Sequence, residues 1–550
     1  MTRSLNWLCA ILSLLTLLRC APRPDVAETP RRPNVIFVLA DDLGIMDINA
    51  YATQFTGTPA EEMYYETPNL DRLIGESVAF SQAYATQLCS PSRAGLLAGK
   101  FAPRLGFMTA MPLRETYYNQ ALPVPQGYSP HDVLDHHDDI HIERVWNNAT
   151  SNSALAPETV TLPEAMTDHH AAFLGKWHLG GFGAEGVQPA DQGFEELAYY
   201  DGGGSPYYDW RAAWDNKSTA HFPKMPQKEW AIGKAGEPTR EAYLTDDLTA
   251  RALDFLDRQA ESDTLPPFFL YFNHFAVHSP YQGVEAEVAY YAKKRTRGWN
   301  GHKDPVYASM VAGLDRSVGA LMDKLEATGL ADSTIVVLMS DNGGIDHKIT
   351  PDGSGTDNEP FLGGKACLTE GGIRVPLFIW KKGQQGRWET TPVDYTDLYP
   401  TLLEATGYDA QARVGAEDLD GRSLWSFVDP RSGSYRKDTR YWHYPFNVIY
   451  HSPYDGHALT PHSAIRSGKY KLIFDWYGRR YLYDLEADPY EKNDLAESET
   501  RTRDRLFGEL MEWLKQEVAP RYWPQRNPDY DLTNEIRRDR FEDLIATGSR

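Results

Sequence analysis

The chain has 550 residues, of which 41% are hydrophobic and 12% aromatic, and its formal net charge is −22. This composition is globular, and the length predicts at least two domains, or one large domain with an appendage. The acidic balance, without any stripe rich in lysine and arginine, argues against nucleic acid as a partner.

Residues 1–21 are predicted to be an export signal. Arg3 gives a short positive start, and an almost unbroken apolar run from Leu5 to Leu18 follows, which is too short to span a bilayer comfortably. Cys20 suggests a bacterial lipoprotein signal, although Arg19 stands where such signals have a small residue. We therefore expect export to the periplasm or the cell exterior, with membrane contact only through a lipid anchor on Cys20, if that residue is modified.

The next segments predict an α/β domain over residues 33–435. Residues 22–32, rich in proline and charge, are expected to be a linker. Short apolar runs typical of buried strands then alternate with helical spacing of apolar residues at 248–256 and 307–325. This alternation predicts a large mixed sheet sandwiched by helices. The expected strands are 34–40, 171–176, 267–272, 334–339 and 375–380.

The pattern changes in residues 436–550, which are expected to form a smaller α+β domain. Residues 463–473 and 480–485 are predicted to be antiparallel strands around a turn at 476–478. An apolar stripe at helical spacing follows, made of Leu506, Leu510, Leu514 and Val518.

Polar residues gather where several predicted strands end. Asp41 and Asp42 follow the first strand, and Asp341 and Asn342 follow a later one. In open α/β sheets ligands bind at the carboxyl ends of strands, so these side chains are expected to meet. Carboxylate and amide oxygens suit Ca²⁺ or Mg²⁺ rather than zinc, although a lone Asp-Asp pair is more typical of a solvated turn. Basic residues follow other strands: Lys176, His178 and His278.

The most specific motif is Cys89-Ser90-Pro91-Ser92-Arg93, which opens a predicted helix. A helix N-terminus favours an anion, because its unpaired N–H groups and dipole are positive there. The motif resembles the signature of type I, formylglycine-dependent sulfatases of the alkaline phosphatase-like superfamily. The alternative is an ordinary buried cysteine, which could pair with Cys367.

The resemblance implies a mechanism. In that family a formylglycine-generating enzyme oxidises the cysteine to formylglycine (3-oxoalanine) before folding. One hydroxyl of the hydrated aldehyde attacks sulfur, and the other later expels sulfate. It also implies a single calcium ion, bound by Asp41, Asp42, Asp341, Asn342 and the oxygen that replaces the Cys89 sulfur.

The resemblance extends from Pro33 to about Leu495 and includes three further basic elements. They are Gly175-Lys176-Trp177-His178-Leu179-Gly180, His278-Ser279-Pro280, and Gly364-Lys365 shortly before the run from Glu370 to Pro376. By resemblance, Lys176 and His178 support the formylglycine hydroxyls. His278 and Lys365 would bind sulfate and protonate the leaving oxygen, while Arg93 would hold the substrate oxygens. Spacing alone does not decide which basic residue is the acid.

Two further segments are open to more than one interpretation. Residues 201–211 carry several aromatic side chains, which can stack on sugar rings, so Trp210 and Arg211 are predicted to bind substrate; a packed loop is the alternative. The His-rich stretch 131–141 could bind a transition metal, although its spacing fits no standard zinc site, and an insertion at the rim is the alternative.

We therefore expect a sulfuric ester hydrolase whose substrate is a sulfated carbohydrate or polysaccharide. The prediction that the substrate is a carbohydrate rests on the export signal, the insertions and the aromatic stretch. These features are associated with such substrates but do not identify one. One alternative is a phosphodiester or phosphonate monoester hydrolase of the same superfamily. Another is a catalytically inactive glycan-binding protein, against which the intact cysteine, acids and bases argue.

Overall fold

The computed structural model describes residues 32–110, 146–147, 151–152, 154–180, 186–211, 243–261, 264–296, 302–346, 355–415, 419–446, 461–476 and 478–526. The predicted signal, nearly all of the linker and the His-rich stretch 131–141 lie outside these residues. No helix among the described residues is long and apolar enough to cross a membrane. Residues 33–550 form one compact unit, whereas the proposed boundary at 435 stays a prediction.

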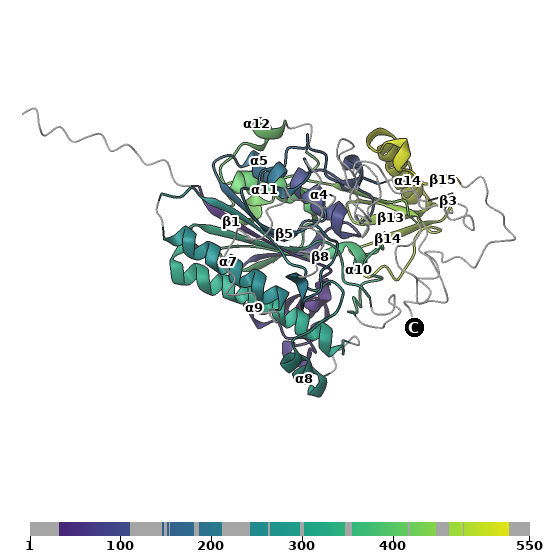
Figure 1. Ribbon diagram of the computed structural model, residues 1–550. Coiled ribbons are helices and arrows are strands. Elements are labelled where there is room, and N and C mark those ends of the chain that lie inside the picture. The colour runs from purple at the N-terminus through teal and green to yellow at the C-terminus, as the bar shows by residue number, and fades with distance from the viewer. Residues whose placement is uncertain are drawn as a thin grey trace, which may run out of the picture. The chain divides into compact units, whose positions relative to one another are not determined.

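A mixed sheet, nine-stranded within the described residues, lies at the centre of this unit (Figure 1). The strand order is β10-β2-β8-β7-β1-β6-β4-β5, and β9 pairs with β2. The central strand β1 is parallel to β6 and β7, and β8 runs antiparallel to β7 and β2. The bounds are β1 Asn34–Ala40, β2 Val78–Tyr84, β4 His170–Lys176, β5 Glu196–Tyr200, β6 Phe268–Asn273, β7 Thr334–Ser340, β8 Arg374–Lys381, β9 Arg387–Glu389 and β10 Val393–Asp394.

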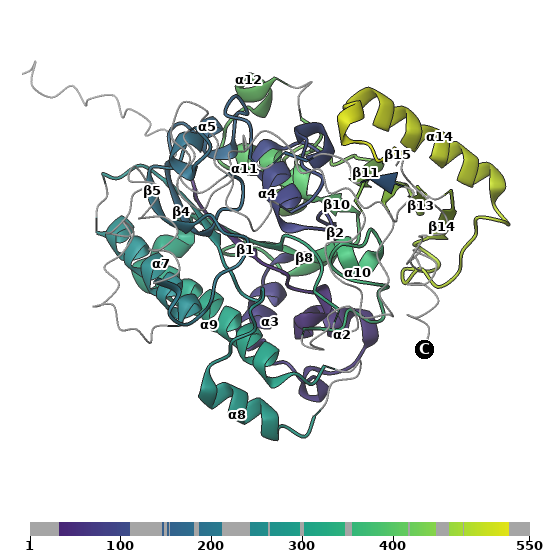
Figure 2. The same cartoon turned by 45° about the vertical axis from the view of Figure 1, so that its right-hand side comes forward.

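Helices cover both faces of the sheet, because successive side chains of a strand point to opposite sides. Ile36 and Val38 of β1 pack in one core with α7 and α9, whereas Val35, Phe37 and Leu39 pack in the other with α4 and α11. Figures 1 and 2 show these two layers. The first layer holds α2 Asn49–Thr56, α3 Pro68–Gly75, α7 Leu244–Ala260, α8 Glu285–Lys293 and α9 Pro305–Thr328; the second holds α4 Cys89–Ala98, α5 Leu162–Ala165 and α11 Leu398–Ala405.

Strand register determines which loops meet at the edge that carries the predicted acids. Ala40 lies opposite Ser340, and Leu39 lies opposite Asn273. Since these three parallel strands end together, the residues that follow them are neighbours, although they are far apart in sequence. The predicted α/β fold class is confirmed.

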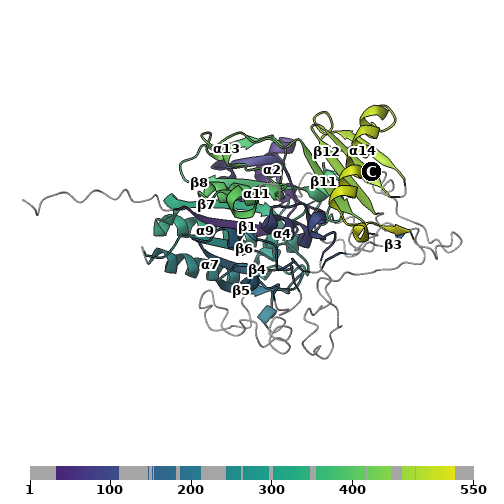
Figure 3. The ribbon, with the colours of Figure 1, turned by 90° about the horizontal axis from the view of Figure 1, so that it is seen from above.

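The C-terminal region forms a separate four-stranded antiparallel sheet, ordered β11-β12-β13-β14, with α14 packed on it (Figure 3). Leu506, Leu510 and Leu514 of α14 are fully buried, as the stripe predicts. The segment 463–473, expected to be a single strand, instead holds two, because Gly468 adopts a left-handed φ of 57° and turns the chain. The bounds are β11 Thr439–Tyr444, β12 His462–Ser467, β13 Tyr470–Asp475, β14 Arg480–Asp484 and α14 Thr500–Glu517.

Buried polar contacts join this sheet to the central one. Trp442 of β11 donates from Nε1 to the carbonyl oxygen of Ala85 at 2.9 Å. Lys471 of β13 is fully buried between Glu370 and Glu491, at 2.9 and 2.8 Å. Glu370 begins the short helix α10 (Glu370–Ile373), five residues after Lys365, so the C-terminal sheet supports the segment that carries Lys365.

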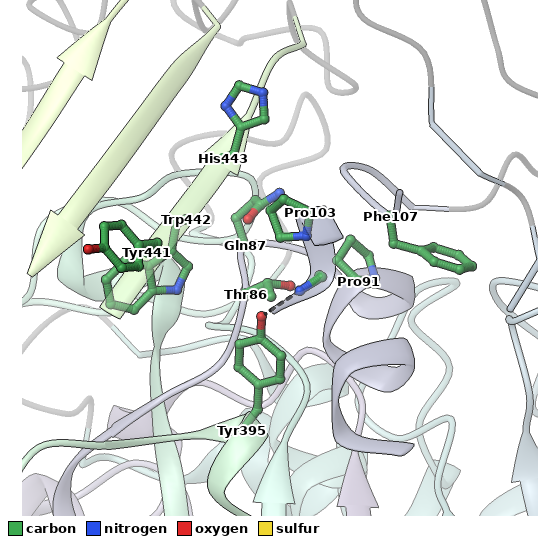
Figure 4. A pocket seen from close by; sticks show the side chains of 10 residues that line it. Thr86, Gln87, Pro91, Pro103, Phe107, Tyr395, Tyr441, Trp442 and His443 are labelled. Atoms are coloured by element: carbon green, nitrogen blue, oxygen red, sulfur yellow. Dashed lines mark hydrogen bonds between the residues drawn. The ribbon is translucent and has the colours of Figure 1, made fainter. Parts of the chain in front are cut away.

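A small pocket lies where β11 meets the segment preceding α4 (Figure 4). Thr86, Gln87 and Pro91 line it from one side, and Trp442 and His443 from the other. Residues predicted to be catalytic are not among the side chains that line it. The pocket therefore belongs to the junction between the sheets rather than to the predicted site.

We predict a pH-dependent contribution of His443 to stability. Burial lowers the pKa of His443 to about 4, and its Nε2 lies 2.9 Å from the carbonyl oxygen of Tyr522. The folded state therefore binds fewer protons than the unfolded state between pH 6.5 and 4, so stability is lost as the pH falls through this window. The stability advantage of the wild type over His443→Gln should shrink by about 2 kcal/mol between pH 7 and pH 5 in urea unfolding. If the stability difference between the wild type and His443→Gln does not change with pH, the predicted role of His443 is wrong.

Candidate active site

The two acidic loops meet at the carboxyl end of β1 and β7. The backbone N–H of Asp42 donates to Oδ1 of Asp341 at 3.2 Å, and Nδ2 of Asn342 donates to Oδ1 of Asp42 at 2.8 Å. Asp41, Asp42, Asp341 and Asn342 are all buried. Asp42 adopts a φ of 61°, a left-handed conformation that costs energy and is characteristic of functional sites.

Cys89 lies beside these acids as the first residue of α4. One ligand atom each from Asp41, Asp42, Cys89 and His278 lies within 4.8 Å of the other three. The Sγ atom marks where an oxygen would stand after oxidation to formylglycine. Cys89 and Cys367 are both buried free thiols, so the alternative of a disulfide between them is not realised.

Arg93 connects α4 to the acidic cluster. Its Nε donates to Oδ2 of Asp341 at 2.9 Å, and the terminal nitrogen NH2 lies 2.8 Å from the same oxygen. NH1 donates to the carbonyl oxygen of Lys176 at 2.9 Å. Burial disfavours the charge, but Asp341 and Asp41 raise the pKa of Arg93 above its ordinary value. Arg93 is therefore a fixed cation one helical turn from Cys89.

Two lysines and a histidine lie against the aspartates. Lys176 Nζ is 2.7 Å from Oδ2 of Asp41, and Lys365 Nζ is 2.6 Å from Oδ1 of Asp42. His278 Nε2 is 3.7 Å from Oδ2 of Asp42. Burial opposes the charge of Asp42, but Lys365 and His278 hold its pKa well below the ordinary value. For Asp41 the effect of burial is larger: it raises the pKa to about 8, although the nearby Lys176 lowers it.

His178 lies two residues after the end of β4. It is 2% exposed and has a φ of 58°. Burial raises the pKa of Asp201 well above its ordinary value, and the backbone N–H groups of His178 and Gly180 act in the opposite direction. The chain around His178 is thus placed next to a buried carboxyl group.

The oxygen atoms of the acidic cluster are suitable ligands for a hard cation. Three buried oxygens of this cluster have no hydrogen-bond partner: Oδ1 of Asp41, Oδ2 of Asp42 and Oδ1 of Asn342. Such atoms are costly to bury unless something binds them, and carboxylate and amide oxygens are the ligands that Ca²⁺ and Mg²⁺ prefer. The structure thus brings together the acids predicted from sequence.

The interpretation of Trp210 as a sugar-stacking side chain is wrong. Trp210 is 2% exposed and packs in a core cluster, and the neighbouring Tyr207 is fully buried. Arg211 lies over the Trp210 ring at 4.9 Å and pairs with Asp247 at 2.7 Å. The packed-loop alternative describes these residues, because a ring inside the core has no free face for a sugar.

Sequence reasoning missed Asn273, the last residue of β6. It is buried, and its Oδ1 accepts from NH1 of Arg93 at 3.3 Å. The available signal was a polar residue ending an apolar strand, the same pattern that identified Asp41.

Comparison with known proteins places this arrangement in a family. Residues 33–408 match the family model described as Sulfatase, and residues 362–519 match that described as N-sulphoglucosamine sulphohydrolase, C-terminal. The chain belongs to the sulfatase family. The predicted family is confirmed, and this sulfatase-family protein has the fold expected of it.

Individual relatives show how far the similarity reaches. N-acetylgalactosamine-6-sulfatase of Homo sapiens is 31% identical over 388 residues, which are 69% of this chain but only 63% of the human protein. A sulfatase of Formosa agariphila is 28% identical over 542 residues, 90% of each chain. The crystal structure of Ps i-CgsB matches with a TM-score of 0.65 at 26% identity, over 90% of this chain and 95% of the other. Ps i-CgsB has also been solved in complex with k-i-k-neocarrahexaose.

Proposed function

We propose that this sulfatase-family protein hydrolyses sulfate esters of carbohydrates, using formylglycine made from Cys89 as its nucleophile and a calcium ion held by the acidic cluster. The observation that carries the proposal is the position of Cys89. It opens a buried helix, and its Sγ lies within 4.8 Å of ligand atoms of Asp41, Asp42 and His278. A formylglycine-generating enzyme would be the maturation partner.

The local charges support an anionic substrate. The chain as a whole has a formal net charge of −22, yet four basic side chains converge here: Arg93, Lys176, His278 and Lys365. Cations and a helix N-terminus together favour a tetrahedral anion. Formylglycine would supply a hydroxyl nucleophile and a second hydroxyl that expels sulfate, and calcium would polarise the sulfate oxygens.

The chain's own residues would orient these groups. Arg93, fixed by Asp341 and the Lys176 carbonyl, would hold substrate oxygens. His278 has one nitrogen, Nδ1, 2.6 Å from the carbonyl oxygen of Ser279, which leaves Nε2 facing the cluster. Either His278 or Lys365 would give a proton to the leaving oxygen.

The proposal of a carbohydrate substrate rests on the relatives and on the predicted export signal. One relative is named an N-acetylgalactosamine-6-sulfatase, and Ps i-CgsB binds k-i-k-neocarrahexaose. We propose that this protein is exported and acts on a sulfated carbohydrate in the periplasm or outside the cell, with or without a lipid anchor on Cys20.

A panel of substrates tests the proposal. Purified enzyme should release sulfate from at least one sulfated glycan and from 4-nitrophenyl sulfate, and should act at least about tenfold more slowly on 4-nitrophenyl phosphate and a phosphonate monoester. Faster phosphate or phosphonate turnover would favour the phosphoesterase alternative. Binding of a glycan without release of any product would favour the inactive binding protein.

A further inference from the structure

Tyr207 contacts the segment that carries His278. The Tyr207 side chain is fully buried in the loop between β5 and α7. Its hydroxyl lies 2.6 Å from the carbonyl oxygen of Phe275 and 3.0 Å from that of His278, and its one hydrogen is shared between these two acceptors. One hydroxyl group therefore holds two points of the turn that leads into His278.

Tyr207 is itself fixed at several points. Its backbone N–H donates to Oε1 of Gln282 at 2.7 Å, and its carbonyl oxygen accepts from the N–H of Leu244 at 2.9 Å. Its ring stacks on Tyr243, with centroids 5.4 Å apart and an interplanar angle of 24°. Because Gln282 follows His278 by four residues, Tyr207 restrains the segment from 275 to 282 near both of its ends.

The orientation of the His278 ring depends on this backbone. Nδ1 lies 2.6 Å from the carbonyl oxygen of Ser279, the next residue. The backbone of Gly204 approaches the His278 ring so closely that an added Cβ would lie 3.1 Å from Nδ1 and 3.0 Å from the Ser279 oxygen. A shift of the turn would therefore move Nε2 relative to Asp42.

We propose that Tyr207 is a positioning residue that acts on catalysis through His278. The inference rests on the proposed function, in which His278 contacts the sulfate group. It gives the aromatic stretch a role different from sugar stacking: its buried hydroxyl sets the position of an active-site histidine. A displacement of about 1 Å in a reacting group can cost as much as a hundredfold in rate.

The test compares Tyr207→Phe with a matched control, Tyr51→Phe. Tyr51 is also fully buried, and its hydroxyl also contacts the backbone twice, at the carbonyl oxygen and N–H of Leu377. Both variants should lose a similar amount of thermal stability. Tyr207→Phe should lose roughly tenfold in kcat for 4-nitrophenyl sulfate, with KM changed less than about threefold, whereas Tyr51→Phe should keep wild-type kcat.

Two further measurements decide whether the effect passes through His278. Gly204→Ala, which places a Cβ against the His278 ring, should also lower kcat. Adding Tyr207→Phe to His278→Gln should cause no further loss, because residues that act as a unit are not additive. Equal kcat losses in Tyr207→Phe and Tyr51→Phe, or a full tenfold loss in the His278→Gln background, would overturn the proposal. If the wild type turns over 4-nitrophenyl phosphate and no sulfate ester, the proposed function fails, and the same comparisons on the phosphate ester still test Tyr207.

Discussion

Replacing Cys89 by alanine is expected to reduce turnover of sulfate esters by at least about a thousandfold while the protein still folds. Cys89 is 1% exposed at the start of α4, and alanine fills most of the same space. A plain thiol could attack sulfur, but the product would have no neighbouring hydroxyl to expel sulfate. Hydrated formylglycine would carry two hydroxyls on one carbon, one to attack sulfur and one to expel sulfate. A covalent intermediate could therefore break down without attack of water on sulfur.

The matched control is Cys367→Ala, which also removes a buried thiol. Burial raises the pKa of Cys367 to about 12, so this thiol stays protonated and is unsuited to act as a nucleophile. This variant should keep near-normal kcat. Peptide mass analysis of residues 80–100 from active enzyme should show formylglycine at position 89. Full activity in a preparation that holds only the thiol, or in Cys89→Ala, would end the proposed mechanism.

The cluster of strand-end acids and the position of the Cys89 motif beside it could be predicted from sequence, because both are local patterns with a geometric consequence. Asp41 and Asp341 each follow a buried strand directly, and parallel neighbours end at one edge of a sheet. The Cys89 motif combines a helix start with an arginine one turn later, and the structure places that arginine on Asp341. Fold class followed from the alternation of strands and helices.

Other features depend on long-range packing that no local pattern reveals. Trp210 and Tyr207 lie in a stretch with glycine, serine and aspartate, which suggests an exposed loop, yet tertiary contacts bury both rings. The turn at Gly468 is not evident from sequence, because the apolar and basic residues around it are compatible with one continuous strand. Asn273 was missed because a single amide at a strand end is common without function.

Removal of calcium should abolish activity and lower the melting temperature, and calcium should restore both. Asp41, Asp42 and Asn342 each have one buried oxygen without a hydrogen-bond partner. A bound cation would coordinate these oxygens and so offset the cost of burying them. A ligand at a hundred times its Kd stabilises the folded state by about 3 kcal/mol, so the shift is measurable by thermal unfolding without an activity assay. Calcium content measured by mass spectrometry would show whether a chelator has removed the ion or whether it is trapped.

Comparing Asp341→Asn with a control variant separates the loss of a metal ligand from the loss of a buried ion pair. Asp341→Asn keeps the shape of the side chain but removes a ligand charge, so turnover should fall at least about a hundredfold and calcium should no longer raise the melting temperature. It also leaves Arg93 without its nearest carboxylate, which lowers stability by itself. The control is Asp394→Asn. Asp394 is a buried aspartate on β10, and it pairs with Lys437 at 2.6 Å and with Arg440 at 3.3 Å. This control should lose stability yet keep both its calcium response and its turnover. Normal turnover in Asp341→Asn, or the same calcium response in both variants, would refute the metal assignment.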